Sequence, residues 1–187
     1  ITHFCAPIFV FLAGTSVYLM SRKKSIPELR AFMLKRGIWL VIVEVLIITF
    51  AWSFNPFYNV IILQVIWAIG ISMILLGLII SLPVNAIIAI GAIIILGHNL
   101  LDIPGIANSL KGHFMSDLVF DAEFAYYNFT PTHGIMVVYA FLPWTGLMFL
   151  GYGFGQLYQQ GYDAVKRQSL LMKLGIAISL FFIVIRF

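Results

Sequence analysis

The chain has 187 residues, of which 62% are hydrophobic and only 10% are charged, and its formal net charge is +4. A soluble domain of this size could not keep so apolar a surface hydrated, so the composition excludes an ordinary soluble protein. The single cysteine, Cys5, excludes an internal disulfide and a cysteine-rich metal site. The basic residues flank apolar runs, which argues against a nucleic acid as the partner.

Apolar runs of about bilayer length, roughly 20 helical residues, follow one another along the chain. Lipid offers no partner for bare backbone groups, so the spans should be helices. We therefore predict an all-α, polytopic transmembrane helical bundle with about six spans. Their approximate ranges are 4–20, 37–54, 59–82, 84–101, 134–152 and 170–187. Because the chain begins at Ile1 and ends at Phe187 within apolar runs, we interpret 1–187 as a single transmembrane domain that is incomplete at both ends.

Basic residues predict the orientation in the membrane. The stretch SRKKSIPELRAFMLKRG (21–37) holds six of the eleven Lys and Arg residues, and a second basic cluster lies near 153–173. With six spans these two loops fall on one side of the membrane, and the positive-inside rule makes that side cytoplasmic. The opposite, extracytoplasmic side then holds the loop segment 102–133. All four histidines fall towards that outer side: His3, His98, His113 and His133.

The stretch GHNLLD brings polar groups to the outer end of the fourth predicted span. At about 1.5 Å of rise per residue, His98 lies about 9 Å below the outer boundary and Gln64 about 8 Å below it. These two side chains can share a layer, with Asn99 and Asp102 within about one turn above them and His133 near the mouth. Polar residues within spans are costly and tend to be functional. The pattern indicates a polar pocket that is open to the outside.

Structural interpretations of the same residues stay open. His98 and Asn99 could end the fourth helix, and His133 could cap the fifth. Glu44, in LVIVEVLII, should be neutral or paired with a basic or amide group, and it could line a pathway or fix helix packing by one hydrogen bond. The small residues of LAGTS (12–16) favour close helix packing. No HxxxH or HExxH spacing is present, so we expect no metal.

Five stretches that occur in order along the chain resemble the catalytic-domain family of heparan-alpha-glucosaminide N-acetyltransferase, and its bacterial members more than the lysosomal enzyme. They are ITHFCAPIFVFLAGTS (1–16), KRGIWLVIVE (35–44), ILQVIWAIG (62–70), GHNLLD (97–102) and LPWTGLMFLGYGFG (142–155). The family consists of multi-span membrane acyltransferases, and the lysosomal member moves an acetyl group from cytosolic acetyl-CoA to a sugar amine across the membrane. The family's best-argued catalytic histidine would precede Ile1, and its role does not transfer to His3.

The resemblance implies an integral membrane acyltransferase, in a bacterial inner membrane, that moves an acyl group from cytoplasmic acyl-CoA to an extracytoplasmic sugar or glycan acceptor. Acyl transfer needs a base near the acceptor proton, which suits His98 or His133. It also needs donors for the developing oxyanion, which Gln64 and Asn99 could supply, while Asp102 could orient a histidine.

On the cytoplasmic face, Arg36 is our candidate contact for the phosphates of the acyl-CoA. The bilayer, the acyl-CoA and the acceptor are then the partners, and a homo-oligomer is possible. Two alternatives stay open. One is a small-solute transporter or channel with a path lined by Glu44, Gln64 and His98; the other is a non-catalytic membrane subunit.

Overall fold

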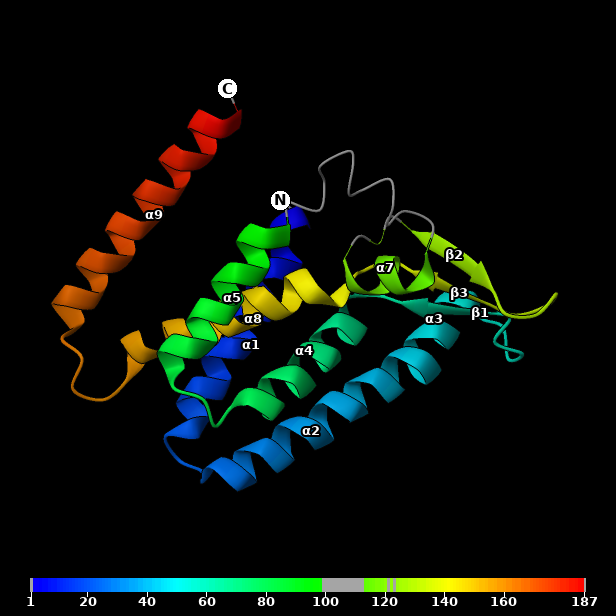
Figure 1. Cartoon of the computed structure of the whole chain (residues 1–187), viewed down its shortest axis with the longest axis horizontal. Coiled ribbons are helices and arrows are strands. Elements are labelled where there is room, and N and C mark those ends of the chain that lie inside the picture. Colours follow the sequence, from blue (N-terminus) through cyan, green and yellow to red (C-terminus); the bar gives the residue numbers. More distant parts are fainter. Residues whose placement is uncertain (1, 99–112, 121, 123, 187) are drawn as a thin grey trace.

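The structure, a computed structural model, describes residues 2–98, 113–120, 122 and 124–186, and it is mostly helical (Figure 1). A bundle of apolar helices makes up most of the molecule. Its members are α1 (Thr2–Ser21), α2 (Ile26–Val43), α4 (Val65–Ile79), α5 (Val84–His98) and α8 (Phe141–Phe154). A short 3₁₀ helix, η3 (Gly155–Tyr158), follows α8, and α9 (Ala164–Arg186) lies at the edge of the bundle.

The second helix is longer than the sequence predicted. It runs without a break from α2 through a π-helical turn, η1 (Glu44–Ile48), into α3 (Thr49–Ser53). Our predicted span of 37–54 therefore missed residues 26–36, because the basic residues there suggested a loop. A proline in the first turn and hydrogen bonds from Ser25 to the Glu28 carboxylate, at 2.8 and 3.0 Å, mark the real start.

A small sheet corrects the prediction of an all-α fold. Its strands are β1 (Val60–Leu63), β2 (Ala125–Asn128) and β3 (Gly134–Val137), in the order β1-β3-β2. Strand β1 pairs in parallel with β3, and β2 pairs with β3 in the antiparallel direction. The predicted spans 59–82 and 134–152 therefore begin as strands, and their helices start only at Val65 and Phe141. Short apolar runs rich in β-branched residues fit a strand as well as a helix, which is why the pattern misled.

Helix length does not show the six predicted spans. Within the part of the chain that the structure describes, one helix, at Ala164–Val184, is long and apolar enough by itself to cross a membrane. Three other apolar helices are shorter, at Cys5–Ser21, Val65–Ile79 and Val84–His98. The 15 residues of α4 rise about 22 Å, less than the roughly 30 Å of a hydrocarbon core. The last helix begins before the predicted residue 170.

Helix α8 lies at the centre of the bundle and packs against α1, α4 and α5, while α2 packs against α4. Glycines at these crossings let the backbones approach closely. A Cβ on Gly151 would lie 2.0 Å from the Phe11 carbonyl oxygen of α1, and one on Gly14 would lie 2.0 Å from the Met148 oxygen of α8. The Thr15 hydroxyl adds a hydrogen bond of 3.0 Å to the Gly151 oxygen. The packing role expected for LAGTS is confirmed.

Candidate functional site

Three of the candidate catalytic residues, His98, Gln64 and His133, lie at the end of the bundle that carries the sheet. Helix α5 ends there at His98, and the short helix α7 (Phe114–Val119) lies against β2. Figure 1 shows this end opposite the α1–α2 turn and the start of α9. Two of the predicted catalytic residues, Asn99 and Asp102, lie outside the described residues.

His98 is half-buried, and its ring is held by one hydrogen bond. Its Nε2 lies 2.7 Å from the carbonyl oxygen of Phe120, directly after α7. A carbonyl can only accept, so Nε2 carries the hydrogen and donates it. In the neutral ring this leaves the lone pair on Nδ1. The geometry therefore fixes both the tautomer and the nitrogen that can take up a proton.

A carboxyl–phenol pair that we did not predict lies beside this contact. The hydroxyl of Tyr127 in β2 donates to Oδ2 of buried Asp117 in α7, at 2.5 Å. Burial and this hydrogen bond raise the pKa of Tyr127 to about 12. The ring of Phe114 packs edge-on against Tyr127, with 5.2 Å between centroids. The alternation in AYYN was the available signal for a strand with one inward face.

His133 stabilises a turn rather than starting a helix. It lies between β2 and β3, and the N-cap of α8 is Ala140, so the alternative that His133 caps the fifth helix is excluded. Its Nδ1 lies 2.8 Å from the hydroxyl of Thr132, and its Nε2 donates to the carbonyl oxygen of Phe57 at 3.3 Å. Both ring nitrogens are thus engaged, and the side chain is exposed.

Gln64 is the N-cap of α4, and its side chain makes no cap hydrogen bond. Its backbone N–H donates instead to Oε1 of Glu44 at 2.7 Å. Glu44 is fully buried, so the carboxyl of η1 caps the first turn of a neighbouring helix. The sequence left open whether Glu44 lines a pathway or fixes packing by one hydrogen bond; this contact favours packing. No hydrogen bond in the described ranges links Gln64 with His98 or His133.

The basic end of the molecule holds the candidate phosphate contact. The exposed guanidinium of Arg36 lies 6.0 Å from the centroid of the Phe32 ring, and the ammonium of Lys24 lies 5.4 Å from the same centroid. Two cations thus share one aromatic ring near the start of α2. Arg30 is engaged differently: it donates to the Gly77 oxygen at the end of α4, at 3.2 Å.

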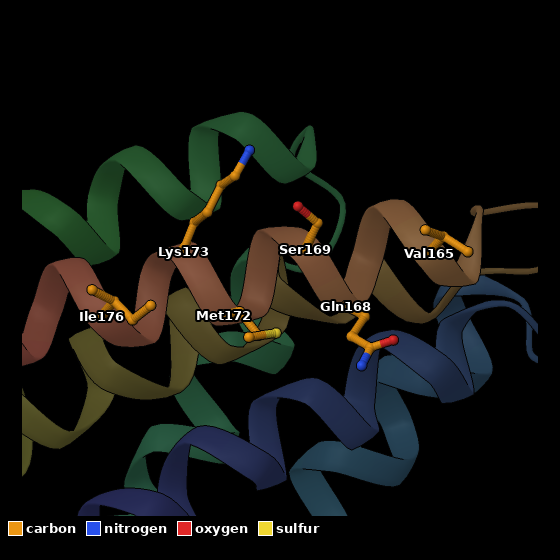
Figure 2. A pocket seen from close by; sticks show the side chains of 6 residues that line it. All are labelled: Val165, Gln168, Ser169, Met172, Lys173 and Ile176. Atoms are coloured by element: carbon orange, nitrogen blue, oxygen red, sulfur yellow. The ribbon is translucent and has the colours of Figure 1, made fainter.

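A hollow of about 370 Å³ lies along α9, away from these residues. Figure 2 shows Ser169 and Lys173 pointing to one side of the helix and Gln168 and Met172 to the other. No site residue predicted from the sequence lines it. Over the described parts of the chain, no group of three or more His, Cys, Asp or Glu side chains is arranged to hold a metal ion.

Comparison with known proteins confirms the resemblance that the sequence suggested. Residues 1–184 match the family described as "Heparan-alpha-glucosaminide N-acetyltransferase, catalytic". The search of curated proteins found no match, and neither did the search of solved structures. Because the match covers nearly the whole chain, this chain belongs to the heparan-alpha-glucosaminide N-acetyltransferase catalytic family.

Proposed function

We propose that the chain is an integral membrane acyltransferase that moves an acyl group, in the first instance acetyl, from cytoplasmic acyl-CoA to an extracytoplasmic sugar or glycan acceptor. The observation that carries this proposal is the family match over residues 1–184. An apolar exterior supports the membrane setting: Phe9, Trp39 and Leu96 are 62%, 60% and 74% exposed on three different helices.

The proposed orientation has the α1–α2 turn and the start of α9 in the cytoplasm and the sheet on the outside, in a bacterial inner membrane. Both basic clusters lie on the side of the α1–α2 turn and the start of α9, which the positive-inside rule makes cytoplasmic. The shortness of α4 and α8 fits this arrangement, because each follows a strand that continues the chain towards the outer surface. We propose that strand and helix together cross the depth that we had assigned to one long helix.

His98 is the proposed general base at the outer end. The acceptor nitrogen or oxygen attacks the carbonyl carbon of the acyl thioester, and the C–S bond breaks. The acceptor proton passes to Nδ1 of His98, and the departing thiolate of CoA takes up a proton. The bond to Phe120 holds the ring while Nδ1 works. We keep Gln64, Asn99 and Asp102 as candidate donors and orienting groups, and assign His133 to positioning the turn that it closes.

Arg36 and Lys24 are the proposed contacts for the phosphates of the acyl-CoA. Both cations are exposed at the basic end, and their stacking on Phe32 orders them without neutralising them. The chemistry of the donor fits this end, because CoA carries several negative charges and no ion pair among the described residues joins an acidic side chain to either cation.

The test uses sealed vesicles that contain the protein, with acetyl-CoA labelled on the acetyl group supplied at the basic face and amino sugars and envelope glycans on the other side. We expect label on an acceptor across the membrane. His98→Ala should lower turnover by about 10²-fold or more. His113→Ala is the matched control, since His113 is exposed at the N-cap of α7 and makes no side-chain cap bond.

Unchanged turnover in folded His98→Ala would remove His98 from the mechanism. Solute uptake without release of CoA would replace acyl transfer by transport.

A further inference from the structure

The most deeply buried acid in the described ranges belongs to the π-helical turn of the second helix. Glu44 has no exposed surface. Its carbonyl oxygen accepts the backbone N–H of Thr49 and, at 3.1 Å, the Thr49 hydroxyl. The hydroxyl oxygen of Thr49 in turn accepts the Ile62 N–H of β1 at 3.1 Å. The backbone of Glu44 is therefore fixed between the helix and the sheet, in a kind of turn that is frequent at functional sites.

One half of the Glu44 carboxyl is fully used. Oε1 accepts the Gln64 N–H at 2.7 Å. A carboxyl from another helix thus does what an N-cap side chain does elsewhere. This contact holds the carboxyl in place.

The other half has no partner, and neither does a neighbouring donor. Glu44 Oε2 and Trp67 Nε1 are both buried and make no hydrogen bond. Buried polar groups are nearly always paired, so two unpaired atoms at one helix start call for an explanation. Their chemistry is complementary, since an indole N–H only donates and a carboxylate oxygen accepts.

The two side chains are not free to turn towards each other. Glu44 is held by the hydrogen bond from Gln64 to its Oε1, and the Trp67 ring packs edge-on against Phe141 at the start of α8, with centroids 6.3 Å apart. A bridging molecule must accept from Trp67 and exchange a hydrogen bond with Glu44. The carboxylate would repel an anion, and the positive end of the indole N–H dipole would repel a cation. Water satisfies both groups, because it can accept from the indole and donate to the carboxylate.

We propose that Glu44 Oε2 and Trp67 Nε1 bind one buried water molecule at the start of α4, and that Glu44 gains and loses its proton through this water. The inference does not depend on acyl transfer. The described elements next to Glu44 bring no charged side chain close to the site. Strand β1 and helices α3 and α4 carry no titratable side chain, and Tyr58 donates its hydroxyl to the Leu46 oxygen of η1. The charged residues of α2 precede Glu44 by at least eight positions, about 12 Å along the helix.

The test is nuclear magnetic resonance of the full chain in lipid nanodiscs with ¹⁵N-labelled tryptophan. The four indole N–H signals are few enough to resolve, and Trp67→Phe assigns the one that matters. We expect a cross-peak between the Trp67 indole proton and a long-lived water, and an indole shift that changes with pH. Glu44→Gln should keep the water and abolish the pH response. Asp117→Asn, which changes the buried acid of α7, should leave the Trp67 response unchanged.

Glu44→Leu removes the oxygen partner and should remove the water cross-peak. If that variant does not fold, Glu44→Gln alone decides, because it keeps an oxygen for the α4 cap. The proposal is overturned if wild-type Trp67 shows no water contact, or if its pH response survives in Glu44→Gln. An indole signal that moves on substitution of Glu44 without any water contact would mean a direct bond, and it would also overturn the proposal.

Discussion

Replacing Gly151 by alanine should force α1 away from α8. The new Cβ would lie 2.0 Å from the backbone oxygen of Phe11 and 3.0 Å from its Cα, so no side-chain rotation can relieve the contact. Ordinary contact begins at 3.4 Å, so the two helices must separate by about 1.4 Å at this point. The crossing of α1 and α8 is the most extensive helix contact in the bundle. The overlap therefore cannot be relieved by moving a side chain into solvent.

The loss can be estimated from three contributions. Overpacking a dense core costs about 1–3 kcal/mol. A gap of about 1 Å forfeits up to about half of the dispersion energy of the contacts on either side of it. The Thr15–Gly151 hydrogen bond would also lengthen, and such bonds in membranes are worth about 0.6 kcal/mol. We expect the free energy of unfolding to fall by about 3 kcal/mol, which lowers the melting temperature by about 6–12 °C in a chain of this size.

Thermal unfolding in detergent micelles, followed by circular dichroism, measures this effect. Gly175→Ala is the matched control, because Gly175 lies in α9 and a Cβ there meets nothing within 4 Å. Alanine should leave that helix unchanged or stabilise it by up to about 1 kcal/mol. Gly14→Ala should behave like Gly151→Ala, since its Cβ would lie 2.0 Å from the Met148 oxygen. Equal melting temperatures for Gly151→Ala and Gly175→Ala would refute the close crossing.

The remaining predictions concern polar groups. The pKa of Tyr127 is raised from 10.0 to about 12, so its pairing with Asp117 stabilises the fold below pH 10, and that contribution is lost as pH rises through about 12. The difference in tyrosinate absorbance between wild type and Tyr127→Phe should show this late ionisation. Ionisation of Tyr127 near pH 10 would contradict the pairing. Thr145→Val should destabilise by about 1 kcal/mol in chemical denaturation, since it breaks a buried 3.0 Å bond to Ser72; an unchanged midpoint would argue against that bond. Arg36→Ala should raise the KM for acyl-CoA about tenfold at unchanged kcat, and an unchanged KM would exclude the contact.

The sequence predicted the helices better than their ends. Long apolar runs identify buried or lipid-facing helices regardless of context, so every predicted span contains a real helix. The residues just before α4 and α8 were different, because the strand VIIL is as apolar as the helix that follows it. What makes it a strand is pairing with GIMV, far along the chain, and local periodicity cannot reveal a distant partner.

Sequence reasoning could select candidate site residues only where the residue type itself is unusual for its position. A histidine at the end of an apolar run stands out, and His98 was singled out in this way; its catalytic role stays a prediction. The pairing of Asp117 with Tyr127 and the use of both His133 nitrogens depend on the fold of the sheet, so neither could be predicted before that sheet was known. Glu44 was singled out by its depth, but its partner is a backbone N–H, which leaves no mark in a sequence.

The parallel pairing of β1 with β3 has a consequence for biosynthesis. Val60 pairs with Gly134, so β1 leaves the ribosome long before its partner exists. Until β3 arrives, the edge of β1 exposes unpaired N–H and C=O groups, and the strand that precedes α4 has no partner. Closing this long connection fixes the starts of α4 and α8 side by side in one late step. Damage to the strands should therefore leave the early helices formed and arrest the protein in a form that other chains or proteases can recognise.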